Sequence, residues 1–249
     1  MSVAAETACA DPPYADLVER ITARDWNRHH RELDARGHSL LPGLLDVAAC
    51  RDLIDGYADA ARFRSRVVMA RHGFGQGEYQ YFAYPLPAIV SSLRSAFYDR
   101  LVDLANQWNG MLGSPVRYPA SHAAFLARCH AGGQSRATPL LLRYGPGDYN
   151  CLHQDLYGEH VFPLQVAVLL SRPGCDFDGG EFVLTEQRPR RQSRVDVVPL
   201  RQGDAVVFAV NQRPVAGTLG SYRATLRHGV SRVRSGNRYT LGVILHDAQ

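Results

Sequence analysis

One imidazole and one carboxylate, His153 and Asp155, stand two residues apart in the middle of the chain. In an extended segment side chains alternate between faces, so both groups would project to the same side. His228 lies far along the sequence, and a strand beside the first could supply it as a third ligand. Two histidines and one carboxylate on one face of a non-haem Fe(II) ion leave the opposite face open to small molecules. These three residues are therefore the candidate metal ligands and catalytic residues.

The cysteines allow one alternative to this site. The five of them are scattered, odd in number and without a CxxC spacing, which favours reduced thiols over a disulfide framework. Cys151 stands two residues before His153, so a Cys/His zinc site is conceivable, but the second pair of ligands that would complete it is missing.

The chain carries no pattern for membrane insertion or secretion. No apolar run approaches the roughly 18 to 20 residues of a membrane span, and residues 1–13 lack the basic-then-apolar layout of a secretory signal. We expect a cytoplasmic protein without a membrane partner.

Every one of the 28 basic residues is an arginine. The lack of lysine excludes a P-loop lysine, a Schiff base and a lysine general base. The net charge is only +4, but residues 188–238 hold eleven arginines against two acidic residues. Such a local positive potential could suit phosphates or an acidic co-substrate, although a solvated face is the more common role of such residues.

The first half of the chain has the periodicity of helices. Residues up to about Asp11 are expected to form a disordered start, followed by one or two surface helices over residues 14–36. Asp46 has the position of a helix N-cap after a short extended piece. Residues 86–112 form the strongest predicted helix, and a looser segment with His122 and His130 follows.

The residue pattern changes from helical to β-rich after residue 138. Short β-rich runs punctuated by Gly and Pro, without helices between them, indicate an antiparallel sandwich or barrel. We predict an α+β chain in which residues 139–249 form a β core and residues 1–138 form a helical, substrate-side portion packed on it. The predicted strands cover residues 140–144, 164–170, 181–184, 195–200, 205–210, 222–228 and 239–245.

Residues 63–84 alternate arginine and aromatic side chains with apolar ones around three glycines. Side chains of these types can stack on a nucleobase and neutralise its phosphates. An ordinary twisted hairpin with tyrosines on a half-buried face would have the same pattern. The candidate substrate residues here are Arg66, His72, Tyr79 and Tyr81.

The pattern of His153-x-Asp155, His228 and Arg238 resembles that of the Fe(II)/2-oxoglutarate-dependent dioxygenases. This resemblance covers about residues 140–247 and implies a double-stranded β-helix, the jelly-roll or cupin-like fold. Two further resemblances are more specific, and the second covers most of the chain. Arg143-Tyr-Gly-Pro-Gly followed by Leu152-His-Gln-Asp155 is similar to a segment of the AlkB family, which oxidatively demethylates alkylated nucleic acid bases. Runs such as Arg227-His-Gly-Val-Ser resemble a bacterial oxygenase group thought to act on damaged DNA.

The resemblance implies Fe(II), dioxygen and the co-substrate 2-oxoglutarate, which would chelate the iron through its C1 carboxylate and keto oxygen. Arg238 would bind the distal carboxylate through the bidentate fork of its guanidinium, with Thr240 and Tyr144 as further hydroxyl donors. Arg232 and Arg234 are alternatives for the carboxylate.

The implied activity is hydroxylation of a C–H bond or an N-methyl group, with release of succinate and CO2. On an N-methyl group the hydroxylated product would release formaldehyde, which amounts to demethylation of a nucleic acid base. Leu142 and Ile244 stand where the AlkB pattern has asparagine and a second arginine, and Arg238 follows His228 at the shorter, prolyl-hydroxylase-like interval of ten residues. A hydroxylase of a protein side chain or a small molecule, or a barrel that binds metal without turnover, is therefore an alternative.

Overall fold

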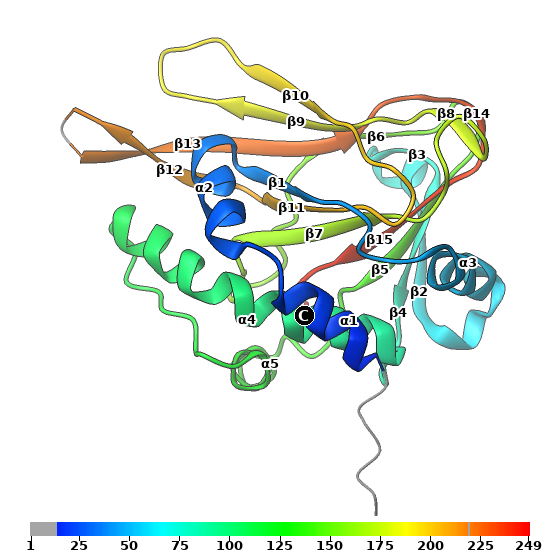
Figure 1. Ribbon diagram of the computed structural model, residues 1–249, viewed down its shortest axis with the longest axis horizontal. Helices are drawn as coiled ribbons and strands as arrows, with labels where there is room; N and C mark the ends of the chain where they lie inside the picture. The colour runs from blue at the N-terminus through cyan, green and yellow to red at the C-terminus, as the bar shows by residue number, and fades with distance from the viewer. Residues whose placement is uncertain (1–13, 219) are drawn as a thin grey trace, which may run out of the picture.

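The computed structural model describes residues 14–218 and 220–249, so the predicted disordered start up to Asp11 lies outside the described part. Two antiparallel sheets face each other, and the helices gather on one side of the β structure (Figure 1). The larger sheet has the order β1 (His38–Leu41), β11 (Ala205–Ala209), β7 (Leu164–Leu169), β15 (Arg238–Val243), β5 (Leu140–Tyr144), β4 (Glu78–Phe82) and β2 (Phe63–Val68).

The smaller sheet and a short hairpin complete the β structure. The smaller sheet has the order β10 (Arg194–Val198), β9 (Phe182–Gln187), β13 (Gly220–Val230), β6 (Tyr149–His153) and β3 (Gly75–Gln76), with β12 (Gln212–Gly217) also paired to β13. The remaining pair is β14 (Val233–Gly236) with β8 (Phe177–Gly179). All seven predicted strands are present, with bounds that differ by a few residues.

The two predicted portions of the chain share one sheet. From the N-terminal portion, β1 pairs with β11 and β4 pairs with β5, both antiparallel. The glycine-rich stretch between residues 63 and 84 is a hairpin of β2 and β4, with β3 attached to β6 in the other sheet. This stretch therefore contributes to both walls of the space between the sheets.

The helices are α1 (Ala15–Thr22), α2 (Trp26–Arg36), α3 (Val47–Asp55), α4 (Ala88–Met111) and α5 (His122–Ala131), with short 3-10 turns at η1 (Gly56–Ala58), η2 (Ala60–Arg62) and η3 (Met69–His72). The predicted cap of α3 is confirmed, because the Asp46 carboxylate accepts a hydrogen bond of 2.8 Å from the Ala49 amide. The prediction of a looser segment around His122 was wrong. Ser121 caps α5, whose Phe125 and Cys129 are buried.

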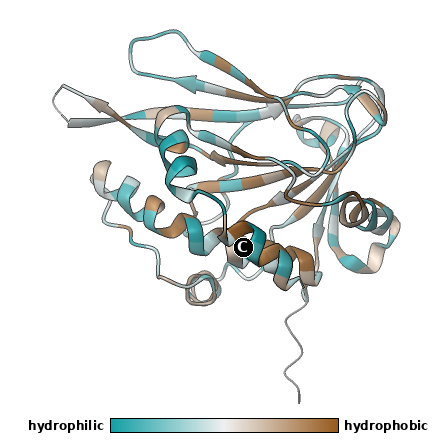
Figure 2. Ribbon diagram, in the orientation of Figure 1, coloured by the Kyte–Doolittle hydropathy of each residue, from teal (hydrophilic) through white to brown (hydrophobic). Residues whose placement is uncertain are grey.

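Two hydrophobic cores lie on opposite faces of the larger sheet. One is formed with the helices and includes Leu93, Phe97 and Trp108 of α4. The other fills part of the space between the sheets and includes Phe182 and Phe208. Figure 2 shows the matching alternation of hydrophobic and hydrophilic residues along the helices and strands. Because both faces are covered, the strand β7 is buried along its whole length.

A buried ion pair ties α4 to the end of the chain. The Arg94 Nη2 and Asp247 Oδ1 atoms are 2.6 Å apart, and the two side chains are 1% and 0% exposed. The Arg94 Nε also donates to the Ile244 carbonyl, and the Tyr84 hydroxyl donates to the second Asp247 oxygen. This network fixes the segment after β15 against the helical layer.

We predict that Arg94→Met lowers the free energy of unfolding by about 3–5 kcal/mol, because it leaves the Asp247 charge buried without its guanidinium partner. Denaturant unfolding followed by circular dichroism measures this loss. Arg36→Met is the matched control, since Arg36 pairs with Glu32 at the surface and is 51% exposed, and its loss should cost less than about 1 kcal/mol. Equal effects of the two variants would contradict the prediction.

Candidate metal centre

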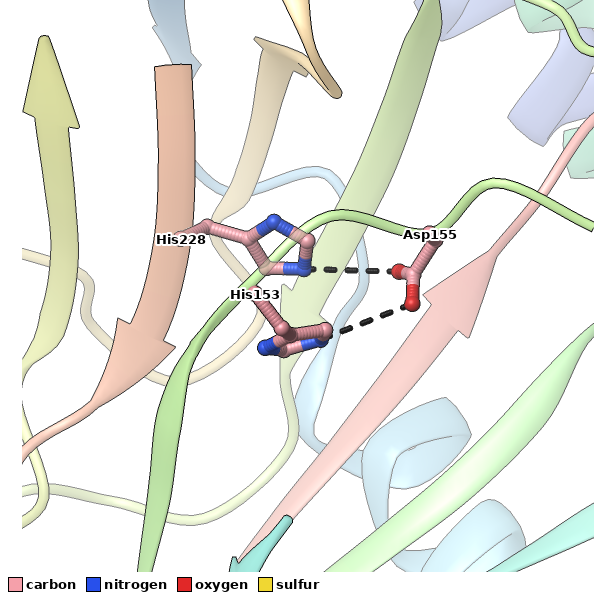
Figure 3. A group of neighbouring side chains, drawn as sticks. All are labelled: His153, Asp155 and His228. Atoms are coloured by element: carbon pink, nitrogen blue, oxygen red, sulfur yellow. Dashed lines mark ion pairs between the residues drawn. The ribbon is translucent and has the colours of Figure 1, made fainter. Parts of the chain in front are cut away.

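His153, Asp155 and His228 converge on one point between the sheets (Figure 3). Each offers one ligand atom, and these atoms all lie within 4.8 Å of one another. The His153 Nε2 is 3.5 Å from Asp155 Oδ1, and the His228 Nε2 is 3.4 Å from Asp155 Oδ2. The convergence that the His-x-Asp spacing predicted is confirmed.

Strand pairing brings these residues together. His153 ends β6 and lies opposite His228 of β13, while Asp155 follows two residues after the strand. The β13–β6 register shifts between His228 and Val230. Gly229 permits the close approach of the strands there, because a Cβ at this position would lie 2.7 Å from the Asn150 carbonyl oxygen.

The surroundings orient both imidazoles. The His153 Nδ1 is 2.8 Å from the Cys151 carbonyl oxygen, which requires a proton on Nδ1 and leaves the Nε2 lone pair facing the other ligands. The ring of His228 packs against Phe208 at 4.6 Å and Phe182 at 6.1 Å between centroids. Both nitrogens that face Asp155 are thus available to a metal ion.

The electrostatics favour an ionised carboxylate. Burial alone would raise the pKa of Asp155, but hydrogen bonding and charge from His153 and His228 outweigh it and hold that pKa well below its ordinary value. The Tyr157 hydroxyl donates a 2.8 Å hydrogen bond to Asp155 Oδ1. A carboxylate and two imidazoles, each neutral once it coordinates, form the donor set that Fe(II) takes in facial triads.

A cavity of about 280 Å³ extends from this point. Its walls are mostly apolar and aromatic, with few polar side chains, as in sites that take small organic molecules. The lining residues that concern the following argument are Phe74, Tyr79, Tyr81, Leu142, Tyr144, His153, Asp155, Tyr157, Gln165, Phe208, His228, Arg238 and Thr240.

Arg238 supplies a buried positive charge to the cavity. Its side chain is 1% exposed, and its guanidinium carbon lies 5.5 Å from the Tyr144 ring centroid and 5.9 Å from that of Phe177. Its Nη1 donates a 2.6 Å hydrogen bond to Thr240 Oγ1. Gly180 leaves room for this side chain, since a Cβ there would meet Arg238 Cδ at 2.8 Å. Burial lowers the pKa of Arg238 to about 10, so the group stays charged at neutral pH.

Two polar atoms at this end of the cavity have no hydrogen-bond partner among the described residues: Arg238 Nε and the Tyr144 hydroxyl. Buried polar atoms are normally paired, so such atoms indicate a missing acceptor. A carboxylate fits, because it would accept from the guanidinium and the hydroxyl together. The cavity residues thus suit both Fe(II) and an acid with a distal carboxylate.

The two alternative arginines for this carboxylate bind elsewhere. Arg232 donates to the Gly147 carbonyl and stacks on Tyr149, and Arg234 pairs with Asp178 at the surface. Several other arginines of residues 188–238 also form ion pairs with acidic side chains. Arg213 is buried against Glu186, which also binds Arg188 and Arg194. The positive potential that the sequence predicts is therefore partly neutralised.

Two of the four predicted substrate residues line the cavity and two lie outside it. Tyr79 and Tyr81 line the cavity, but Arg66 does not. Because side chains alternate along β4, Glu78 lies on the opposite face, and Arg66 pairs with it there. His72 is exposed and stacks on Phe74 at 5.3 Å, so it reaches the cavity only through that ring.

Sequence reasoning missed Tyr157, Gln165, Phe74 and Phe208 as cavity residues. Tyr157 stands two residues after Asp155, and that spacing was a usable signal. Gln165 is a single amide within an otherwise apolar strand, which was a second signal. The zinc alternative fails, because within the described ranges the metal-spaced cluster of His, Cys, Asp and Glu side chains does not include Cys151.

The fold is that of the 2-oxoglutarate- and Fe(II)-dependent oxygenases. A prolyl-4-hydroxylase from Pseudomonas putida is similar with a TM-score of 0.51 and 17% identity, covering 87% of this chain and 96% of that one. An oxidoreductase of the 2OG-Fe(II) oxygenase family from Burkholderia pseudomallei is similar with a TM-score of 0.51 and 17% identity, covering 91% and 94%. The predicted double-stranded β-helix with N-terminal helices is confirmed.

A family model described as an oxygenase catalysing oxidative methylation of damaged DNA matches residues 77–248. The chain belongs to this family and is an oxygenase. An uncharacterized protein of Mycobacterium tuberculosis is 49% identical over 167 residues, which cover 67% of this chain and 72% of that protein. In the described part of the chain, no helix has the length and apolar character needed to cross a membrane.

We predict that Tyr157→Phe weakens binding of Mn(II) about 10- to 100-fold, because it removes the hydrogen bond that orients the Asp155 carboxylate. Calorimetric titration of the metal without co-substrate or substrate measures the change. Tyr118→Phe is the control, since its hydroxyl donates to the Val161 carbonyl instead. Unchanged Mn(II) affinity in Tyr157→Phe would show that the hydroxyl has no part in positioning the ligand.

Proposed function

We propose that the protein is an Fe(II)- and 2-oxoglutarate-dependent dioxygenase that removes N-methyl groups from damaged nucleic acid bases. His153, Asp155 and His228 hold the iron, and Arg238 binds the distal carboxylate of 2-oxoglutarate. The observation that carries this proposal is the buried guanidinium of Arg238, whose Nε has no partner among the described residues and which shares the cavity with the three ligands.

The residues at the Arg238 end are suited to a dicarboxylic 2-oxo acid. Thr240 holds one side of the guanidinium, which fixes its orientation, and Tyr144 offers a free hydroxyl beside it. A guanidinium in this apolar setting attracts an anion more strongly than it would in water. Since His153, Asp155 and His228 line the same cavity as Arg238, one 2-oxo dicarboxylate could be bound by both the metal and this arginine.

The bound iron would supply the redox chemistry by which dioxygen reacts with 2-oxoglutarate and substrate. In the overall reaction one oxygen atom enters succinate, the other enters the substrate C–H bond, and CO2 is lost. A hydroxylated N-methyl group then loses formaldehyde and leaves the N–H form of the base. The chain's own residues bind, orient and keep the reactants from water, because the walls are largely apolar.

The family match supports damaged DNA as the substrate class. The aromatic walls of Tyr79, Tyr81 and Phe74 are consistent with a flat ring, because aromatic side chains stack on bases. A cavity of this kind would require the base to leave its stack, as in other enzymes that modify bases. We therefore propose dioxygen as the second co-substrate and damaged DNA as the macromolecular substrate.

We predict that Arg238→Met raises the KM for 2-oxoglutarate about 10- to 150-fold, which corresponds to the loss of about 1.5–3 kcal/mol from a charge-assisted hydrogen bond. Succinate release at varied 2-oxoglutarate measures it. A second substrate provides the control, because 2-oxobutyrate lacks the distal carboxylate and should be used equally poorly by both proteins. If Arg238→Met lowered turnover of 2-oxobutyrate as much as that of 2-oxoglutarate, Arg238 would not act by binding the distal carboxylate.

The substrate class is tested by formaldehyde release from single- and double-stranded DNA carrying N-methylated bases, with unmethylated DNA of the same sequence as control. We predict formaldehyde and succinate in equal amounts from methylated DNA, once the succinate released with unmethylated DNA is subtracted, and neither product from His153→Ala or Asp155→Ala. A stable product with one added oxygen on a peptide or small molecule, without formaldehyde from DNA, would instead favour the alternative hydroxylase, which the ten-residue interval between His228 and Arg238 allows.

A further inference from the structure

The side-chain oxygen of Gln165 lies buried in the cavity wall without a partner among the described residues. Gln165 is 5% exposed, and its Oε1 accepts no hydrogen bond from any described residue. Its neighbours along β7 are all apolar and buried. Burying an unpaired amide costs free energy, so a purely structural role gives no reason for a glutamine at this position.

Gln165 lies at the end of the cavity remote from Arg238. In the pairing of β15 with β7, Thr240 is opposite Leu169 and Gly242 is opposite Ala167. Arg238 and Gln165 are therefore six residues apart along these strands, which is roughly 20 Å at about 3.3 Å per residue. A 2-oxo acid that spans from Arg238 to the metal ligands would leave the Gln165 end unoccupied.

The walls at this end are flat and aromatic. Phe208 pairs directly with Gln165 across the β11–β7 register, and Tyr81 and Tyr157 line the same cavity. Among these rings, the side-chain oxygen of Gln165 is a buried acceptor that no described residue satisfies. By contrast, the Gln154 amide is already held by the Asn211 side chain and the Leu226 carbonyl.

We infer that Gln165 is the specificity-determining contact for the primary substrate and that it reads a hydrogen-bonding edge of a nucleobase. A primary amide presents one acceptor and one donor side by side, which matches the paired donor and acceptor atoms on the edge of a base. The inference rests on the proposed function, and it names the residue that selects the base within the same cavity.

The experiment compares wild type with Gln165→Met, which keeps the length of the side chain but removes its hydrogen-bonding atoms. Single-stranded oligonucleotides, each with one N-methylated adenine, cytosine, guanine or thymine, serve as substrates. We expect kcat/KM for the preferred oligonucleotide to fall about 10- to 100-fold. The ratio of kcat/KM between the best and the worst of the four oligonucleotides should fall as well. The KM for 2-oxoglutarate and its turnover without DNA should not change.

Two measurements separate recognition from a structural role. The thermal midpoint of Gln165→Met should equal or exceed that of wild type, because an unsatisfied amide has been replaced by an apolar group. Gln165→Leu provides a second apolar variant in case the methionine does not pack. Gln202→Met is the matched control, since its amide donates to the Leu170 carbonyl outside the cavity, and it should leave the preference unchanged.

The outcomes distinguish this inference from the proposed function. If wild type releases formaldehyde and Gln165→Met has the same kcat/KM and preference, the inference is overturned and the proposed function stands. A fall in 2-oxoglutarate turnover without DNA would also overturn it, because the residue would then act on the co-substrate. If wild type converts none of the oligonucleotides, the proposed function fails and the inference fails with it.

Discussion

The site depends on one buried carboxylate held between two imidazoles. Asp155 is 6% exposed, and the two Nε2 atoms that approach it come from residues 75 positions apart in the sequence. Only the pairing of β13 with β6 sets His228 opposite His153, so the charge of Asp155 is compensated only in the folded sheet. A metal ion bound there would therefore stabilise the folded state relative to the unfolded chain, in which the ligands are dispersed.

The two sheets have different tasks in this arrangement. The smaller sheet and the loop that follows β6 supply the three metal-spaced residues, whereas the larger sheet supplies Arg238, Thr240 and part of the aromatic wall, including Tyr79, Tyr81 and Phe208. The distance between these two sets is determined by the side chains packed between the sheets, among them Phe182 and Phe208. Changes in this inter-sheet core should alter the position of Arg238 relative to the three metal-spaced residues, although most of the core side chains are apolar.

Local patterns in the sequence were sufficient for much of this site. The alternation rule placed His153 and Asp155 on one side, and the start of β15 at Arg238 was predicted within one residue. The face of Arg66 could not be derived, because the β2–β4 register shifts between Phe63 and Ser65 and a shift of one residue reverses every face. A hairpin was one of the two interpretations of residues 63–84, and an extended piece was expected before Asp46. That β1 and β4 join the larger sheet could not be derived, since their partners β11 and β5 lie more than 50 residues away.

The pairing of β1 with β11 and of β4 with β5 has a consequence for the integrity of the larger sheet. Its two outermost strands, β1 and β2, both come from the first 70 residues. A fragment that began at residue 139 would present β11 and β5 as open edges, with rows of unpaired amides and carbonyls that can pair with other chains. The N-terminal portion thus protects the catalytic half from self-association, and it cannot be removed as a separable appendage.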